Sequence, residues 1–147
     1  MGSGDTPAID LRHIWKVFGP GDSTRTIELS RGGSSRAEIL QQTQQTVAVR
    51  DVSFSVAQGE TFVVMGLSGS GKSTLIRCLS RLIEPTQGEI SLGGDDLLAM
   101  DEDQLRQLRR GRISMVFQHF GLFPHRKVID NIAYGLEVQK VDKSTRL

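Results

Sequence analysis

Gly66–Thr74 reads GLSGSGKST, and this stretch decides the fold. It meets the pattern G-x-x-x-x-G-K-[ST], in which glycines let the backbone wrap around phosphate groups without Cβ collisions. Such a loop forms a nest of backbone N–H groups, and the positive end of the following helix dipole adds to its attraction for anions. The stretch therefore predicts a phosphate-binding loop.

The residues on both sides of the loop fit this interpretation. Thr61–Met65 (TFVVM) is short, β-branched and apolar without alternation, as expected for a strand that is covered on both faces. After Lys72 the apolar side chains recur at helical spacing as far as Ile83, and Pro85 follows. Residues 61–83 are therefore predicted to form a strand, the phosphate loop and a helix.

The side chains of the loop predict a nucleotide and a metal ion as ligands. Lys72 is expected to contact the β- and γ-phosphates, Ser73 to ligate Mg²⁺ through its hydroxyl, and Thr74 to lie near the α-phosphate. The other predicted nucleotide-binding residues are Gly66, Leu67, Ser68, Gly69, Ser70 and Gly71. The alternative is a plain glycine-rich turn that caps a helix, which the specificity of the motif in this setting disfavours.

The N-terminal part of the chain predicts two strands with an insert between them. Ile9–Trp15 and Val47–Val56 alternate apolar and polar residues and are predicted to be half-buried strands. The stretch between them is rich in Gly, Ser and Gln, and Ser35 and Glu38 form a capping-box pattern within it. We therefore expect one short helix, Ser35–Gln45, inside a flexible insert.

The second half of the chain predicts further elements of both kinds. Gly88 and Gly93 bracket a brief strand, and Asp101 resembles the N-cap of a helix. Arg112–Phe117 (RISMVF) predicts another buried strand, and a third helix is expected from about Val128. The last residues are charged and end without a helix stop signal, so we expect the sequence to be the N-terminal part of a longer protein.

Composition and charge narrow the function classes. The 18 basic and 17 acidic residues give a net charge of +1, so the chain lacks the large excess of positive charge that would suggest a nucleic acid as a partner. The single cysteine, Cys78, cannot form an internal disulfide and fits a reducing cytosol. The longest apolar stretch is too short to span a bilayer, so the protein is expected to be soluble or peripherally bound.

Gln118 adds a polar amide at the end of a predicted strand. It follows Arg112–Phe117 at the edge where open α/β sheets bind ligands, and it could reach a metal ion or an attacking water. With this residue the sequence resembles the ATP-binding subunits of ABC transporters, in which such a glutamine forms the Q-loop. The resemblance is strongest in Val63–Ile90 and Arg109–Val138. Two sequence segments, MGLSGSGKST and RLIEPT, and an insert at residues 18–46 are similar to those of subunits that drive import of glycine betaine, proline and related quaternary amines.

The resemblance implies a fold and an organisation for the chain. It implies the α/β fold of P-loop NTPases, with an antiparallel β subdomain, the start of a helical subdomain and an incomplete sheet. Residues 1–147 would form one partial ATP-binding domain, in which 112–124 are a strand and the Q-loop and 125–147 begin the helical subdomain.

The resemblance also implies roles for individual residues. Phe18 would stack on adenine, with Trp15 as a rival for this role that periodicity alone cannot eliminate. Gln118 would act in catalysis and would hold Mg²⁺ together with Ser73. The loop after Gln118 would contact a membrane permease subunit.

The function that the resemblance implies is that of an energising subunit of an ABC importer. Such a subunit binds ATP and Mg²⁺, pairs with a second ATP-binding subunit and lies on the cytoplasmic side of the bacterial inner membrane. The 147 residues contain no apolar strand ending in Asp-Glu, no LSGGQ-type signature and no switch histidine, so we expect them to hold ATP without hydrolysing it. A truncated, non-hydrolysing nucleotide-binding or permease-interaction protein is the alternative, and another P-loop enzyme is a third possibility.

Overall fold

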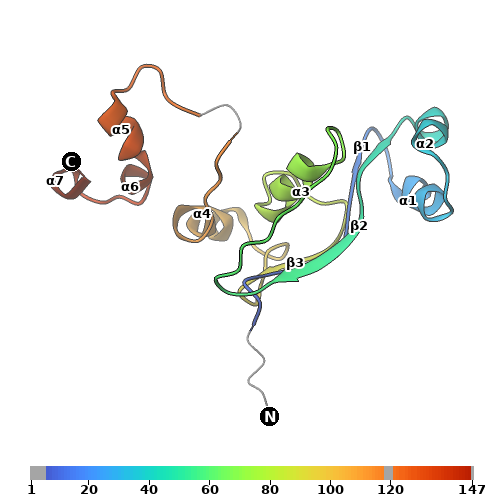
Figure 1. Cartoon of the computed structure of the whole chain (residues 1–147), viewed down its shortest axis with the longest axis horizontal. Helices are drawn as coiled ribbons and strands as arrows, with labels where there is room; N and C mark the ends of the chain where they lie inside the picture. Colours follow the sequence, from blue (N-terminus) through green and yellow to red (C-terminus); the bar gives the residue numbers. More distant parts are fainter. Residues whose placement is uncertain (1–5, 118–120, 147) are drawn as a thin grey trace, which may run out of the picture. The chain divides into compact units, whose positions relative to one another are not determined.

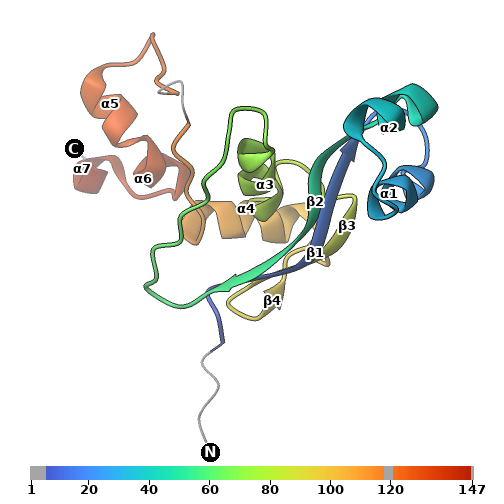
Figure 2. The same cartoon turned by 45° about the vertical axis from the view of Figure 1, so that its right-hand side comes forward.

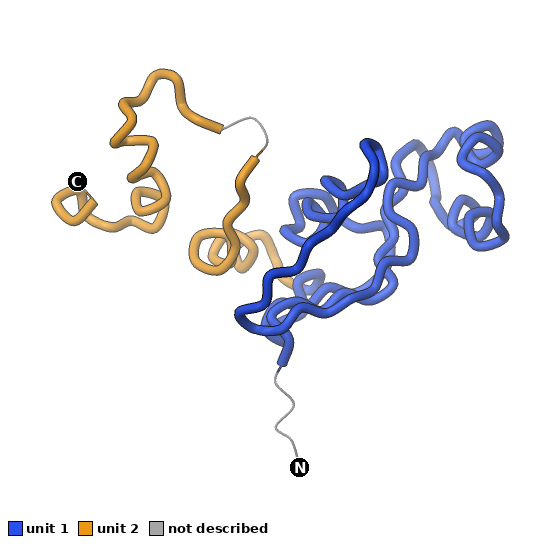
Figure 3. Tube along the Cα trace, viewed as in Figure 1, with its two compact units in different colours: residues 1–99 blue, residues 100–147 orange. Residues whose placement is uncertain are grey.

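The computed structural model describes residues 6–117 and 121–146. The chain divides into two compact units, Met1–Ala99 and Met100–Leu147, which we call the N-terminal and C-terminal units (Figures 1 and 3). The N-terminal unit contains a sheet and the predicted phosphate loop, and the C-terminal unit is helical. Gln118 lies outside the described residues.

A four-stranded antiparallel sheet, ordered β2-β1-β3-β4, forms the base of the N-terminal unit. Its strands are β1 (Ile9–Phe18), β2 (Thr46–Val56), β3 (Gln87–Leu92) and β4 (Asp95–Asp96). The central strand β1 pairs with β2 over almost its whole length, from Ile9 opposite Val56 to Phe18 opposite Thr46. This sheet confirms the predicted antiparallel β subdomain.

An irregularity in β1 changes which side chains face the interior. His13 has a positive φ of 51°, its N–H donates to Ser53 Oγ at 2.8 Å, and the register with β2 shifts between Leu11 and Ile14. An extra residue of this kind breaks the alternation of side chains along a strand. As a result Ile14 and Trp15, which are adjacent in sequence, are both buried.

The insert between β1 and β2 is folded, so the prediction of a flexible insert was wrong. It contains two helices, α1 (Thr24–Arg31) and α2 (Arg36–Thr43), at one end of the β1–β2 pair (Figure 2). The predicted capping box of α2 is confirmed, since Ser35 Oγ accepts from Glu38 N and the Glu38 carboxylate accepts from Ser35 N. The latter bond lowers the pKa of Glu38.

Tertiary contacts explain why the insert is ordered. Its helices contribute to a buried cluster with the two strands, made of Trp15, Val17, Ile27, Ile39 and Val47. The Arg31 guanidinium lies 5.4 Å from the centre of the Trp15 ring, and Arg50 of β2 donates to the Ser30 carbonyl at 2.6 Å. These contacts join α1 to both strands, although α1 has only two large apolar side chains, Ile27 and Leu29.

Ile27→Ala should lower the free energy of unfolding by about 2–5 kcal/mol, because it removes a fully buried side chain and leaves a cavity. Leu40→Ala on α2 is the matched control, since Leu40 is 52% exposed and should cost less than about 1 kcal/mol. Chemical denaturation followed by the fluorescence of Trp15, the single tryptophan, measures both. Equal effects of the two substitutions would show that the insert is not docked on the sheet.

Two predicted strands are not formed. Thr61–Met65 and Arg112–Phe117 belong to no sheet among the described residues, which corrects the predictions made for both segments. Val63, Met65 and Val116 are 69%, 87% and 97% exposed. A strand with apolar side chains on both faces needs neighbouring strands and covering layers to form, and residues 6–117 and 121–146 supply neither.

The helix after the phosphate loop, α3 (Lys72–Leu79), ends before the predicted limit at Ile83. Arg81 takes a left-handed conformation with φ 49°, and Leu82 N donates to the Arg77 carbonyl at 2.9 Å. This pattern is a helix-ending motif, in which a left-handed residue lets the chain satisfy the last carbonyl groups.

The C-terminal unit contains only helices and loops among its described residues. Its helices are α4 (Glu102–Gly111), α5 (Val128–Ile132), α6 (Tyr134–Val138) and α7 (Lys143–Arg146). The predicted N-cap Asp101 is confirmed, because its carboxylate accepts from the N–H groups of Asp103 and Gln104. The predicted helix start at Val128 is also confirmed. Of the helices described, none has the length and apolar character needed to cross a membrane.

Candidate phosphate-binding site

The phosphate loop leads directly into α3, so the start of this helix faces the loop. Gly71 is the N-cap residue, and the first helical hydrogen bond runs from Leu75 N to the Gly71 carbonyl at 2.8 Å. The N–H groups of Lys72, Ser73 and Thr74 therefore have no carbonyl partner within the helix. Together with the positive end of the helix dipole, these groups can bind an anion.

Gly71 also sets how closely the helix approaches the sheet. Its φ is 93°, and a Cβ placed on it would lie 2.1 Å from the Ala48 carbonyl oxygen of β2. Only glycine fits this position, both in backbone conformation and in space. Gly69 has a positive φ of 75° as well, but a Cβ there would meet nothing within 4 Å. The contact with β2 thus fixes one end of the loop against the sheet.

The Lys72 side chain folds back into the loop. Its ammonium donates to the carbonyls of Gly66 at 2.8 Å and Leu67 at 2.7 Å, and to Ser70 Oγ at 3.4 Å. A turn closed by Ser70 N and the Leu67 carbonyl at 3.2 Å shapes the same segment. Phosphate oxygens are charged and are stronger acceptors for an ammonium than peptide carbonyls. Lys72 therefore holds a positive charge where a bound phosphate would compete for it.

The hydroxyl of Ser73 is suited to a Mg²⁺ ion. Ser73 is exposed on the first turn of α3, and its side chain makes no hydrogen bond to any residue that the structure describes. Within 6–117 and 121–146, no group of three or more His, Cys, Asp and Glu side chains could hold a metal. Because Mg²⁺ keeps waters and phosphate oxygens as ligands, one hydroxyl beside the phosphate loop fits its usual coordination.

A cavity of about 780 Å³ extends from the loop within the N-terminal unit. The loop and α3 contribute Gly66, Ser70, Gly71, Lys72 and Leu75 to its lining, and β2 lines it between them and the insert. Its volume is in the range of small-molecule sites. The insert forms a further wall, which includes Ser34 and Arg36. Sequence reasoning missed this wall, because the start of α2 carries no binding motif.

The two candidate stacking rings lie in different surroundings. Phe18 ends β1 and is 43% exposed, with the Lys16 ammonium 5.0 Å from the centre of its ring. Trp15 is only 1% exposed and belongs to the buried cluster with Ile27. Only the Phe18 ring is thus accessible to a ligand. Phe18 does not line the cavity beside the phosphate loop, and its stacking role stays a prediction.

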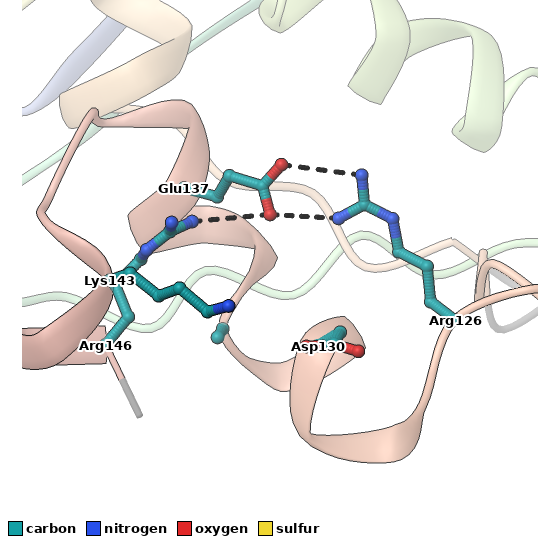
Figure 4. A pocket seen from close by; sticks show the side chains of 6 residues that line it. Arg126, Asp130, Glu137, Lys143 and Arg146 are labelled. Atoms are coloured by element: carbon teal, nitrogen blue, oxygen red, sulfur yellow. Dashed lines mark hydrogen bonds and ion pairs between the residues drawn. The ribbon is translucent and has the colours of Figure 1, made fainter.

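The C-terminal unit has a polar cluster of its own (Figure 4). The Glu137 carboxylate accepts from Arg126 at 3.0 and 3.4 Å and pairs with Arg146 at 3.3 Å, beside a cavity of about 350 Å³. The hydrogen bonds from Arg126 lower the pKa of Glu137. The Arg126 guanidinium also lies 5.1 Å from the ring centres of both Phe123 and Tyr134. The cluster thus ties the loop before α5 to α6.

Asn131 holds the same loop through its side chain. Its Oδ1 accepts from Phe123 N at 2.8 Å, and its Nδ2 donates to the carbonyls of Phe123, Arg126 and Lys127 at 3.1 to 3.3 Å. Lys127 is the N-cap of α5 and provides no side-chain cap. The loop from Phe123 to Lys127 is therefore held by contacts that the sequence pattern does not reveal.

Comparison with known proteins identifies the family of the chain. The sequence model of the ABC transporter family matches residues 49–147. Over 138 residues the chain is 51% identical to the glycine betaine transport ATP-binding protein OpuAA of Bacillus subtilis, covering 94% of the chain and 33% of that protein. It is 47% identical over 146 residues to the trimethylamine N-oxide transport system ATP-binding protein TmoW of Ruegeria pomeroyi, covering 99% of the chain and 42% of that protein.

A solved structure supports the fold. The ATP-binding cassette MJ0796 bound to ADP and Pi superposes with a TM-score of 0.73 at 26% identity, covering 94% of the chain and 52% of that structure. The chain spans 33% and 42% of the lengths of OpuAA and TmoW. The family match covers more than half of the chain and includes the whole phosphate loop at the start of α3. The chain belongs to the ABC transporter family, and its α/β fold is part of an ABC ATP-binding cassette.

Proposed function

We propose that the chain is the nucleotide-binding part of the ATP-binding subunit of an ABC importer for glycine betaine, proline or related quaternary amines. The observation that carries this proposal is the Lys72 ammonium inside the phosphate loop, next to the free N–H groups of α3. The names of the relatives support the class of solute, since they include glycine betaine and trimethylamine N-oxide transport proteins.

Binding of ATP would use groups that the loop already brings together. Lys72 would exchange the carbonyls of Gly66 and Leu67 for the β- and γ-phosphate oxygens. The first N–H groups of α3 would donate hydrogen bonds to the same phosphates. Ser73 and Gln118 would hold Mg²⁺, which when bound neutralises charge on the phosphate oxygens. Phe18 would stack on the adenine ring.

The partners we propose are a second ATP-binding subunit and a membrane permease. The solved relative MJ0796 is described as dimeric. In the C-terminal unit, the residues after the Q-loop position expose large apolar side chains, with Leu122, Val128 and Ile132 at 67%, 77% and 73%. Exposed apolar groups of this kind mark interaction surfaces. Contact with the permease there would place the protein at the cytoplasmic side of the bacterial inner membrane.

The 147-residue chain should bind Mg-ATP but release no measurable phosphate. Hydrolysis requires a positioned nucleophile and charge stabilisation around the γ-phosphate, for which these residues contain only part of the family's motifs. Phosphate release from the purified chain tests this, with Lys72→Ala as the control for contaminating ATPases. A turnover of about 1 s⁻¹ that Lys72→Ala abolishes would contradict the expectation.

A further inference from the structure

The side chain of Gln45 is a buried amide whose hydrogen-bonding groups are all used. It is 1% exposed, and it lies between the end of α2 and the start of β2. Its Oε1 accepts from Thr26 Oγ1 at 2.5 Å, and its Nε2 donates to the Pro20 carbonyl at 2.7 Å and to the carbonyls of Gly21 and Asp22 at 3.3 Å. Three successive carbonyl groups of one loop therefore converge on a single amide.

The loop that Gln45 holds begins directly after Phe18. Gly19 is its first residue, with a φ of 132°, and a Cβ on Gly19 would lie 2.8 Å from Gln45 Cγ and 2.7 Å from the Gln44 carbonyl oxygen. The backbone after Phe18 is thus in close contact with Gln45. In the β1–β2 ladder, Phe18 pairs with Thr46, the residue that follows Gln45.

Thr26 fixes the orientation of the amide. Its hydroxyl can donate to Oε1 but the three loop carbonyls can only accept, so the amide has one arrangement that satisfies every group. Thr26 is itself fully buried on α1. Gln45 and Thr26 therefore hold the backbone of residues 20–22, which follows Phe18 and Gly19, through a largely buried polar network.

We infer that Gln45, oriented by Thr26, is the positioning residue for Phe18 and sets the direction of its exposed ring for stacking on the nucleotide base. This inference rests on the proposed function, in which Phe18 contacts adenine. A ring held in place before binding loses less conformational freedom when the ligand arrives. The Gln45 network shares no residue with the contacts of Lys72, so we expect its loss to affect binding of the base and not binding of the phosphates.

The test separates base binding from phosphate binding in the full-length gene product that contains this chain. The dissociation constants of Mg-ATP and Mg-tripolyphosphate are measured for the wild type, Gln45→Met, Phe18→Ala and the double variant. Gln45→Met keeps the side-chain length and removes the amide. It should weaken Mg-ATP binding about threefold to tenfold, the range of one stacking contact, and leave Mg-tripolyphosphate binding unchanged. In the Phe18→Ala background it should have no further effect.

Three further variants complete the test. Gln42→Met makes the same change at an exposed position of α2 and should alter neither affinity. Thr26→Val removes only the orienting hydroxyl, and it keeps the inference testable if Gln45→Met fails to fold. It should weaken Mg-ATP binding selectively, while Thr26→Ser, which restores the hydroxyl, should behave as the wild type.

The outcomes distinguish the inference from the proposed function. If Gln45→Met and Thr26→Val weaken both ligands together, or neither, the positioning role is wrong and the network is only structural. If Phe18→Ala lowers the preference for Mg-ATP over Mg-tripolyphosphate while Gln45→Met and Thr26→Val do not, the positioning role alone fails. If Phe18→Ala leaves that preference unchanged, the proposed contact between Phe18 and the base is wrong, and the inference falls with it.

Discussion

Lys72→Ala should weaken the binding of Mg-ATP by at least about 100-fold. The ammonium is the one side-chain cation held inside the loop among the described residues, where it donates to two carbonyls and to Ser70. A hydrogen bond to a charged group contributes about 1.5–3 kcal/mol, and Lys72 is expected to make such bonds with two phosphate groups. Isothermal titration with a non-hydrolysable ATP analogue measures the loss.

The control for charge is Arg77→Ala. Arg77 lies in the last turn of the same helix and is exposed, so the substitution removes an equal charge away from the loop. It should change the affinity by less than about threefold, because exposed charges interact weakly through water. Tight, Mg²⁺-dependent binding that survives Lys72→Ala would contradict the assignment of Gly66–Thr74 as the phosphate site.

Gly71→Ala should both destabilise the N-terminal unit and remove nucleotide binding. A Cβ at this position would lie 2.1 Å from the Ala48 carbonyl oxygen, so α3 and β2 would have to separate. We expect a loss of about 2–5 kcal/mol in the free energy of unfolding, from the left-handed backbone and the steric conflict together. The displaced helix start would no longer direct its N–H groups at the phosphates.

Gly69→Ala is the matched control for Gly71→Ala, since both positions have a positive φ. The space around Gly69 is open, and only the backbone cost of about 1–2 kcal/mol applies. Chemical denaturation and nucleotide titration of the two variants isolate the contact with β2. Equal losses of stability in the two variants would mean that the close approach of Gly71 to Ala48 does not occur in the protein.

Features with local causes could be predicted from the sequence. The phosphate loop is specified by its own glycines and lysine, and the capping residues Ser35 and Asp101 bond to N–H groups within three residues of themselves. The helices that these two residues cap were predicted for that reason. Prediction from local sequence failed at Thr61–Met65. This segment has the apolar, β-branched pattern of a buried strand, but a strand forms only when other strands pair with it.

Features that depend on distant contacts were missed. Helix α1 has a weak sequence pattern and owes its order to Trp15 and to the bond from Arg50 to Ser30. Trp15 is buried because of the irregularity at His13, which a periodic pattern cannot reveal. Gln45 lies in a run of polar residues where nothing in the sequence indicates burial. The roles of Phe18 and of Gln118 remain predictions.

The pairing of Phe18 with Thr46 means that the insert leaves and re-enters the sheet at adjacent points. A segment whose two ends are neighbours can change its length without altering the spacing of anything outside it. The turn at Gly32 and Gly33, between α1 and α2, is exposed, so it is the place in the insert where additional residues could be introduced. An affinity tag grafted there should leave the pairing of β1 with β2 intact, but it would lie beside the candidate site, because Gly33 also lines the cavity that extends from the phosphate loop.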